Sequence, residues 1–431
     1  MRHQRLALAT TLALAIAVPA AAQQYTAKQT GNLVELRDTK ADMYVPVVTT
    51  VGRAWKIQVK GKDLVRVGGA TPEAFEAGPG LNGMPPLYPF ANRLDQTAFY
   101  ANGKKYNFDV ELGNVRGPIP STGFVGGYKG WTLVEAKADK DAAWVTCKLD
   151  FYRNPIFMKQ WPFAHTVTVT YRVSNGTLEV RTRLDNLSVE PMPAVIGYHP
   201  IYELPEGTRD DWTVSIGAKT HWIEIPQRLP TGETQPIDNF FEVDHHAIPL
   251  KNYGLIDDVF TDLERDASGR ATMKLMGGGK ELIVTLGPKF KTVLAWSTAL
   301  NAGGGGRGGG GRGPGPGAPG APGGRAGGGP GGPAAPPPAA SGPFPVDPAQ
   351  GVKIAPKAAV AAAPAAPAAP AAPAAPGAAP APANKGFIAF EPMIAITNAL
   401  NLAEKGVYKE LQTIPPGGSW EESFWITTKG Y

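Results

Sequence analysis

The feature that most limits how this chain folds is a long low-complexity tract near its C-terminus. Residues 302–333 are largely Gly, and residues 334–384 are largely Ala and Pro, with Ala-Ala-Pro repeating through residues 362–376. A three-residue proline period matches one turn of polyproline II, which has no internal hydrogen bonds. This composition buries too little apolar surface to fold. We therefore predict a disordered Gly/Pro/Ala insertion over residues 301–384.

The chain that follows the tract is too short to fold alone. Residues 385–431 contain two apolar, strand-like pieces, Phe387 to Phe390 and Phe424 to Thr427, and little else that could form a core. Lengthening a connection from ~5 to ~84 residues costs only about 2.5 kcal/mol of loop-closure free energy. We therefore predict one discontinuous domain, residues 23–300 and 385–431, in which the tail pairs with earlier strands.

The N-terminus has the pattern of a secretory signal. Two arginines in residues 1–5 precede an apolar run, residues 6–18, and the small residues 20–22. The run is shorter than the ~20 residues that a membrane-spanning helix needs. A basic start, a short apolar centre and a small-residue exit are typical of a cleaved signal. We expect residues 1–22 to be removed before Gln23, and the protein to be exported to the periplasm or outside, with no membrane span.

Charge and cysteine content exclude two further classes. The formal net charge is +5. Two of the positive charges belong to the predicted signal, and residues 301–384 carry five basic residues against one acidic residue. The net charge of the remaining residues is therefore near −1, and this near-neutral balance predicts no nucleic-acid surface. Cys147 is the single cysteine, so the chain forms no intramolecular disulfide and must rely on a hydrophobic core.

Outside the signal and the tract, apolar and polar residues alternate as in β-strands. The clearest case is Phe163 to Val173 followed by Leu178 to Leu184, with Asn175-Gly176 as a tight hairpin turn between them. Similar β-rich runs are residues 281–286, 293–296 and 420–427. Ala399 to Lys405 is the one segment expected to form a helical turn or two. The pattern predicts an all-β sandwich or barrel.

Two residues are candidates for acid–base chemistry. His199 lies in Gly-Tyr-His-Pro, where a strand passes into a loop, and such loops carry many reactive groups. A hydrogen-bonded turn histidine fits the same pattern. Glu391 follows the apolar residues 386–390 and precedes Pro392, where we expect the strand to end. Apolar surroundings would raise its carboxyl pKa and suit it to act as a base; an edge glutamate facing water is the alternative.

Two more residues are candidates for binding hydroxyl groups. Arg93 follows a Pro/aromatic turn and an asparagine, and its planar guanidinium offers a donor fork to neighbouring hydroxyls. A surface salt bridge is the alternative for this arginine. Asp257, in Leu-Ile-Asp-Asp-Val-Phe, is placed either to accept hydroxyl hydrogen bonds or to cap a turn.

The remaining histidines predict no metal centre. His165 lies in an alternating strand and is expected to be structural, and His221 fits a half-buried strand position. The pair His245-His246 has no HExxH or other metal-ligand spacing around it. We therefore predict neither a metal nor a cofactor.

Several motifs occur in a characteristic order along the chain. They are PLYPFANR, FYANGKKYNF, TGF with a following GW, WPFAHTVTVTYRV, LDNLS, GYHPIYEL, IDDVF and FIAFEP. In content and order they resemble the aldose 1-epimerase (galactose mutarotase-like) family, over roughly Gly83 to Thr428 without the tract. The resemblance implies a β-supersandwich and an isomerase of carbohydrate metabolism that acts on a free sugar without metal or cofactor.

The resemblance also implies roles for four of these residues. His199 would protonate the ring oxygen as general acid, and Glu391 would take the proton of the anomeric hydroxyl as general base. The ring would open to the aldehyde and close on the other face, giving the opposite anomer. Arg93 and Asp257 would hold sugar hydroxyls.

One departure from the family pattern bears on activity. The family usually has His-Gly-Phe where this chain has Thr-Gly-Phe, beginning at Thr122. We expect Thr122 to contact the sugar directly or through water, with altered substrate preference or weakened activity as the alternatives. A non-catalytic carbohydrate-binding protein on the same fold is therefore a second hypothesis. A sugar-cleaving lyase or hydrolase on a related supersandwich is a third, with Asp257 as the candidate second carboxylate.

Overall fold

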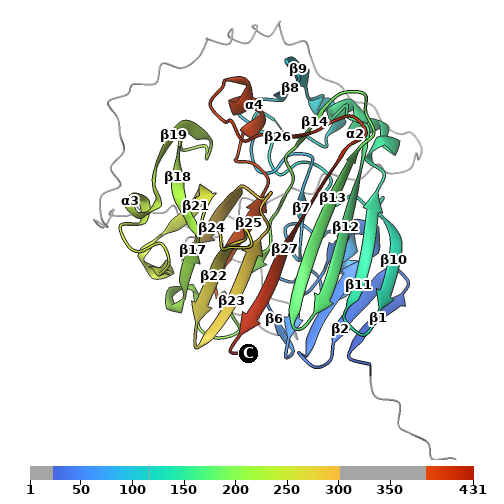
Figure 1. Ribbon diagram of the computed structural model, residues 1–431, viewed down its shortest axis with the longest axis vertical. Coiled ribbons are helices and arrows are strands. Elements are labelled where there is room, and N and C mark those ends of the chain that lie inside the picture. The colour runs from blue at the N-terminus through green and yellow to red at the C-terminus, as the bar shows by residue number, and fades with distance from the viewer. Residues whose placement is uncertain (1–22, 116, 301–384) are drawn as a thin grey trace, which may run out of the picture. The chain divides into compact units, whose positions relative to one another are not determined.

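The structure is a computed structural model that describes residues 23–115, 117–300 and 385–431. The predicted signal and the predicted insertion therefore lie outside the described residues. The described chain is built mainly from β-strands, and its α-helices are only 5 or 6 residues long. It forms the predicted all-β supersandwich (Figure 1).

The largest sheet has nine strands in the order β10-β11-β12-β13-β27-β23-β22-β17-β20 (Figure 1). Its strands are β10 (Thr132–Ala138), β11 (Ala143–Leu149), β12 (His165–Ser174), β13 (Thr177–Asn186), β17 (Thr213–Ile216), β20 (Ile248–Pro249), β22 (Ala271–Gly277), β23 (Lys280–Leu286) and β27 (Ser419–Lys429). The predicted hairpin is present as β12 and β13, and Asn175 and Gly176 both adopt positive φ at its turn. This agrees with the preference of Asn-Gly for such turns.

A second sheet has eight strands and carries the residues of interest. Its order is β19-β18-β21-β24-β25-β15-β7, with β16 also paired to β25. Its strands are β7 (Pro86–Leu87), β15 (Gly197–Tyr198), β16 (Ile201–Tyr202), β18 (Ala218–Glu224), β19 (Pro230–Pro236), β21 (Leu255–Leu263), β24 (Thr292–Thr298) and β25 (Ile388–Met393).

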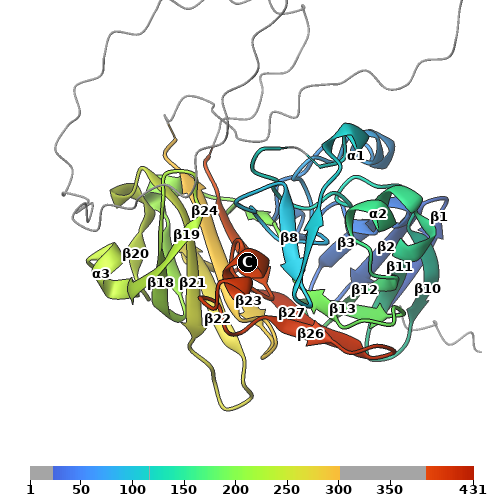
Figure 2. The same ribbon diagram turned by 90° about the horizontal axis from the view of Figure 1, so that it is seen from above.

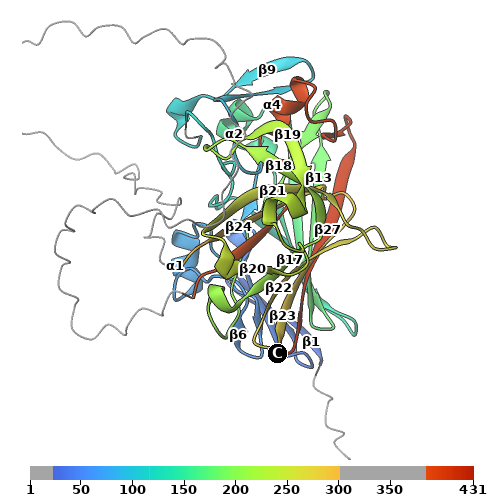
Figure 3. The ribbon, with the colours of Figure 1, turned by 90° about the vertical axis from the view of Figure 1, so that its left-hand side faces the viewer.

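Smaller elements complete the described chain. A six-stranded sheet contains β1 (Tyr25–Thr30), β2 (Leu33–Asp38), β3 (Met43–Val48), β4 (Arg53–Ala54), β5 (Gln58–Val59) and β6 (Lys62–Asp63). Two-stranded pairs are β8 (Ala98–Ala101) with β9 (Lys104–Asn107), and β14 (Met192–Ala194) with β26 (Gln412–Ile414). The helices are α1 (Pro72–Ala77), α2 (Pro155–Gln160), α3 (Ile237–Phe241) and α4 (Ala399–Glu404), with 3₁₀ turns at Thr49–Val51, Val110–Leu112, Phe151–Arg153, Arg209–Asp211 and Leu250–Asn252. Figure 3 places β9 and α4 at the same end of the described chain.

One continuous apolar core joins the three large sheets. Val34 of the six-stranded sheet, Val169 of the nine-stranded sheet and Phe390 of the eight-stranded sheet are fully buried and belong to the same cluster. Burying such side chains is the main stabilising term, at about 1.5–3 kcal/mol for each large apolar residue. The core thus supplies the stability that disulfides cannot.

The C-terminal strands complete sheets that are formed mostly by earlier residues. β25 pairs with β24, and β27 pairs with both β13 and β23. Figure 2 shows these red segments between the yellow-green and the blue-cyan strands. The described residues on both sides of the tract belong to one compact unit. The tail therefore contributes central strands, as its two apolar pieces predicted.

A buried arginine holds together the chain segments that flank the tract. Arg209 has no exposed surface, and its Nε donates to Ser297 Oγ at 2.6 Å. Ser297 Oγ donates in turn to the carbonyl of Phe387 at 2.7 Å, and the Arg209 backbone N–H donates to the carbonyl of Lys385 at 2.7 Å. Charge-assisted bonds of this kind are among the stronger ones, so the two flanks are fixed close to each other.

Two local expectations were wrong. β25 does not end at Glu391 but continues through Pro392 to Met393. Three short helices were also missed. Two of them begin with an N-cap and a proline, Thr71-Pro72 and Asn154-Pro155, where the side-chain oxygen accepts backbone N–H groups. These signals mark helix starts, but the helices are too short to show a 3.6-residue period. No helix in the described part of the chain is long and apolar enough to cross a membrane.

Candidate active site

Strand pairing places His199 against Glu391. β15 and β16 flank His199 and both pair with β25 in one register, which puts His199 opposite Glu391. The backbone N–H of His199 donates to the carbonyl of Pro85 at 3.0 Å, and this bond fixes the loop. His199 Nε2 lies 3.1 Å from Glu391 Oε1. Two candidates that are far apart in sequence are thus in hydrogen-bonding contact.

Both members of this pair are buried. His199 is 7% exposed and Glu391 is 1% exposed, which rules out an edge glutamate facing water. Burial lowers the pKa of His199 to about 4, and burial raises the pKa of Glu391, with a further upward contribution from the charge of Asp257. Desolvation disfavours each charged form. Burial therefore favours the neutral carboxylic acid at Glu391 and the neutral imidazole at His199.

Arg93 and Asp257 form an ion pair beside the buried pair. Arg93 Nη2 donates to Asp257 Oδ2 at 3.2 Å, and Nη1 donates to Asn92 Oδ1 at 2.9 Å. The side chains of Arg93 and Asp257 are 17% and 10% exposed, so this is not a surface salt bridge. Asp257 lies inside β21 and caps no turn. The charge of Arg93 lowers the pKa of Glu391, which links the two pairs electrostatically.

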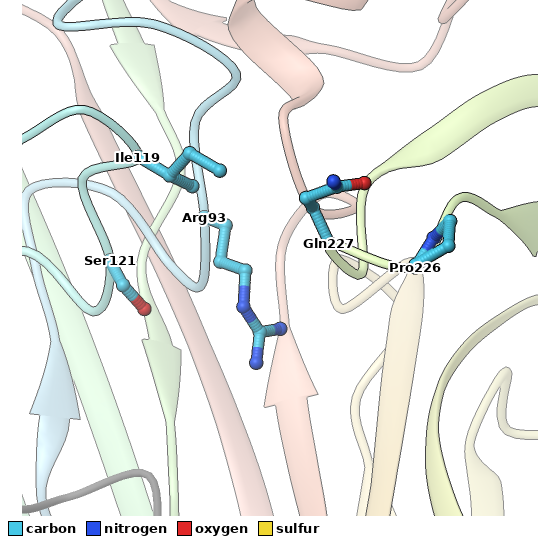
Figure 4. Close-up of a pocket in the computed structure, with 5 residues that line it drawn as sticks. All are labelled: Arg93, Ile119, Ser121, Pro226 and Gln227. Carbon is cyan, nitrogen blue, oxygen red and sulfur yellow. The ribbon is translucent and has the colours of Figure 1, made fainter.

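A pocket of about 410 Å³ opens beside Arg93. It is lined by Arg93, Ile119, Ser121, Pro226 and Gln227. Figure 4 shows the Arg93 side chain extending between Ser121 and Ile119 on one side and Pro226 and Gln227 on the other. The volume falls in the range of ~300–1,000 Å³ that small-molecule sites occupy. The arginine therefore offers donor groups to a ligand in this space.

Thr122 lies next to this pocket, but its hydroxyl is engaged elsewhere. Its backbone N–H donates to the carbonyl of Asn92 at 2.8 Å, and its Oγ1 donates to the carbonyl of Ser121 at 2.7 Å. Its φ is +64°, a conformation that is unfavourable for a β-branched residue. Ser121, which sequence analysis did not single out, lines the pocket directly. The strained turn at Thr122 thus positions its neighbour against Arg93.

Trp296 is a second residue that sequence analysis missed. It lies opposite Asp257 in the β21–β24 register, and its ring centroid is 5.3 Å from that of His199 in an edge-to-face arrangement. It is half-buried. No sequence signal marked it, because its place beside His199 depends on the pairing of β24 with the strand that bears Glu391. Aromatic faces of this kind suit contact with the apolar face of a ring-shaped ligand.

Glu224 is a third missed residue, at the end of β18. Its side chain is 3% exposed, and neither carboxylate oxygen has a hydrogen-bond partner among the described residues. Burial raises its pKa to about 9, with smaller contributions from the charges of Asp258 and Asp257. The guanidinium of Arg228, with Nη1 4.0 Å from Oε2, offsets part of this increase, and the net direction favours the neutral carboxylic acid. Its place in the apolar run Trp-Ile-Glu-Ile was the sequence signal.

Two other histidines have structural surroundings. His165 is fully buried, and its Nε2 lies 2.6 Å from the Tyr88 hydroxyl, in line with the predicted structural role. His221 is only 4% exposed, more buried than expected. It stacks on Phe240 and lies 3.0 Å from Asp258 Oδ1.

A family model described as aldose 1-epimerase matches residues 55–297. The chain belongs to the aldose 1-epimerase family. The match includes Arg93, Thr122, His199 and Asp257, and it ends shortly before the tract. Glu391 lies beyond the match, and strand pairing is what brings it to the same site.

Solved structures share the fold of this aldose 1-epimerase family member. A galactose mutarotase-like protein from Clostridium acetobutylicum is 17% identical, with a TM-score of 0.65 over 94% of this chain and 98% of that one. Galactose 1-epimerase from Lactobacillus acidophilus is 13% identical, with a TM-score of 0.57 over 94% and 98%. A GalM/aldose epimerase homologue from C. elegans is 13% identical, with a TM-score of 0.56 over 90% and 96%. At these identities the likeness establishes the fold.

Proposed function

We propose that this protein is an aldose 1-epimerase that interconverts the α and β anomers of a free aldose. The observation that carries the proposal is the buried contact between His199 Nε2 and Glu391 Oε1 at 3.1 Å. An acid and a base that face each other in a water-poor site can serve the two ends of one hemiacetal. Arg93 and Asp257 beside them supply a donor and an acceptor for sugar hydroxyls.

The reaction conserves protons within the site. Glu391 takes the proton from the anomeric hydroxyl while His199 gives a proton to the ring oxygen, and the C1–O5 bond breaks. The open aldehyde rotates about C1–C2, and the reverse transfers close the ring on the other face. The pair ends each cycle with the protons it began with. This chemistry needs neither an oxidant nor a cofactor.

The resting protonation state requires one internal shift before the reaction. Ring opening requires a protonated His199 and an ionised Glu391, whereas burial favours a neutral His199 and a protonated Glu391. The transfer crosses a 3.1 Å contact and involves no exchange with solvent. The positive charge of Arg93 lowers the pKa of Glu391, which favours its ionised form, and it also lowers the pKa of His199.

Trp296 and the Arg93–Asp257 pair would orient the sugar. The tryptophan ring lies beside His199 and, in strand register, beside Asp257. An aromatic face next to polar groups matches a sugar, which has apolar C–H faces and polar edges. We assign Trp296 to packing against one face of the ring and the ion pair to holding hydroxyls.

The proposal is tested by following anomeric relaxation of freshly dissolved α-glucose and α-galactose by polarimetry. Wild type is expected to speed relaxation above the uncatalysed rate, and Glu391→Gln and His199→Asn are expected to abolish most of this increase. Glu233→Gln, an exposed change in β19, is the matched control and should behave as wild type. Equal rates for wild type and Glu391→Gln with both sugars would refute the proposal for those sugars.

Two other outcomes would indicate the alternative functions. Saturable sugar binding without faster relaxation would indicate a carbohydrate-binding protein on this fold. Release of reducing ends from a polysaccharide would indicate a sugar-cleaving enzyme. Each assay uses the same wild-type and Glu391→Gln preparations, so the outcomes are directly comparable.

We further propose that the protein acts after export. The support is the basic, apolar and small-residue pattern of residues 1–22. Mass spectrometry of the mature protein should show an N-terminus at Gln23, and cell fractionation should find it in the periplasm or the medium. Retention of residues 1–22 on protein in the cytoplasm would contradict the proposal.

A further inference from the structure

A second group of histidines and carboxylates lies where the chain leaves the nine-stranded sheet for the eight-stranded one. Gly217 separates β17 from β18 at this corner. The backbone N–H of Ile216 donates to the carbonyl of His245, and that of Glu264 donates to the carbonyl of Gly217, both at 2.9 Å. The segment after α3 and the residue that follows β21 therefore meet at the end of β17.

Two imidazole nitrogens converge on one carboxylate at this corner. His245 Nε2 lies 3.6 Å and His246 Nε2 lies 3.1 Å from Glu264 Oε2. Asp244, His245 and His246 also each place one ligand atom within 4.8 Å of the others. Bonds of ~2.0–2.1 Å at a tetrahedral zinc ion put neighbouring ligand atoms roughly 3.3 Å apart. The two distances from the histidine Nε2 atoms to Glu264 Oε2, 3.6 Å and 3.1 Å, lie on either side of that value.

The other ring nitrogen of each histidine is held by a neighbouring oxygen. His245 Nδ1 lies 2.6 Å from Asp238 Oδ1 of α3, and His246 Nδ1 lies 3.3 Å from Ser215 Oγ of β17. Metal-binding histidines almost always have such an outer partner, which fixes the tautomer and turns the free nitrogen toward the ion. Both Nε2 atoms therefore face the same carboxylate, and the ionised Asp238, which only accepts hydrogen bonds, leaves the Nε2 lone pair of a neutral His245 directed toward Glu264.

His245 has a buried nitrogen without a partner. The residue is 9% exposed, and within the described residues its Nε2 makes no hydrogen bond. The 3.6 Å separation from Glu264 Oε2 is beyond hydrogen-bond distance. Leaving a buried polar atom unsatisfied costs ~1–3 kcal/mol. An ion bound between the two groups would satisfy this nitrogen.

We propose that His245, His246 and Glu264 bind a divalent transition-metal ion of the zinc type, with Asp244 or water as the fourth ligand. Two imidazoles and a carboxylate form a donor set that zinc favours, whereas magnesium and calcium favour oxygen ligands alone. The ion would join the loop after α3 to the end of β21 and so brace the corner between the two sheets. Sequence spacing did not predict it because Glu264 comes from a separate strand.

The test is calorimetric titration of the full chain, free of any affinity tag, with zinc chloride and separately with magnesium chloride. Wild type is expected to bind one zinc ion per chain saturably and to show no comparable magnesium binding. His246→Gln and Glu264→Gln should each lower zinc affinity at least about tenfold. Asp238→Asn should lower zinc affinity by ~10–100-fold, because Asp238 orients the ring of His245 without binding the ion itself. Glu233→Gln should bind as wild type.

Two results would overturn the proposal. One is the absence of saturable zinc binding by a wild type whose circular dichroism shows β-structure. The other is zinc binding that survives in His246→Gln and Glu264→Gln but disappears in His199→Asn, which would place the ion at His199 and Glu391 instead. Because His246 and Glu264 are partly exposed, both variants are expected to fold, and circular dichroism verifies this directly.

Discussion

Two regions of the molecule make the same contact in different surroundings. His199 Nε2 lies 3.1 Å from Glu391 Oε1, and His246 Nε2 lies 3.1 Å from Glu264 Oε2. The side chains of the first pair are 9% and 1% exposed, and those of the second are 51% and 32% exposed. In the first pair, desolvation favours neutral groups that can exchange a proton. In the second, His246 and Glu264 are accessible to an ion from solvent. At the same distance, the two pairs thus differ in how far water and ions can reach them.

The largest effect should come from removing the buried carboxylate. Glu391→Gln cannot accept the anomeric proton, so kcat/KM for anomerisation is expected to fall by ~10²–10⁴. Because His199 and Glu391 act as one unit, adding His199→Asn should cost little more. Polarimetry on the two single variants and the double variant measures this. Multiplicative losses, or a single loss of less than about threefold, would show that the two residues do not act as a pair.

The pH dependence of the anomerisation rate should reflect the burial of His199 and Glu391. With the pKa of His199 lowered to about 4, the pair holds one proton above that pH and gains a second below it. Glu391 then stays protonated and cannot act as a base, so kcat/KM should fall about tenfold per unit below pH 4. At alkaline pH, loss of the single proton through the raised pKa of Glu391 removes the acid. An acid limb near pH 6.5 would instead indicate a solvated histidine.

Substitution of Glu224, a buried carboxyl without an imidazole partner, should change the stability of the protein rather than its rate. The pKa of Glu224 is raised to about 9, so between about pH 4.5 and 9 the unfolded chain releases this proton while the folded chain keeps it. Wild-type stability therefore falls as pH rises through this window, by at most ~1.4 kcal/mol per unit. Glu224→Gln removes the penalty and should raise the free energy of unfolding at pH 7 by up to about 3 kcal/mol.

Urea unfolding at pH 5 and pH 7 measures this difference. The gain from Glu224→Gln should be several times larger at pH 7 than at pH 5. The exposed Glu233→Gln change should stay within ~0.5 kcal/mol of wild type at both pH values. A pH-independent effect of Glu224→Gln would show that its carboxyl is not protonated in the folded protein.

The smallest effect should follow deletion of the tract. Arg209 and Ser297 hold the flanking segments together, so a chain that joins Leu300 directly to Lys385 should fold. Its anomerisation rate and zinc affinity should stay within about twofold of wild type. Polarimetry and calorimetry on the deletion variant measure both sites. Loss of the rate with zinc binding intact would show that the tract supports Glu391 specifically.

Short-range patterns predicted much of the fold and several candidate site residues. Alternating residues and the Asn175-Gly176 turn predicted the β12–β13 hairpin, because side-chain period and turn geometry are local properties. Motif order singled out His199, Glu391, Arg93 and Asp257, and the structure brings the first two and the last two into contact. The short helices escaped because five or six residues show no helical period.

Trp296 and Glu264 could not be assigned from sequence, because their significance depends on which strands become neighbours. Trp296 matters through its strand register with Asp257, and Glu264 through the corner that brings it to His246. The same holds for the protonation of Glu391, which depends on how completely the assembled sheets exclude water.

The sequence by itself determined that the chain is β-rich, that a Gly/Pro/Ala tract interrupts it, and that the tail must complete a core formed earlier. These conclusions rest on composition, periodicity and the free energy of loop closure, none of which requires long-range contacts. Only the tertiary structure decided that β25 runs through Glu391 into a buried position opposite His199. Long-range strand pairing sets the register, and register sets both burial and pKa.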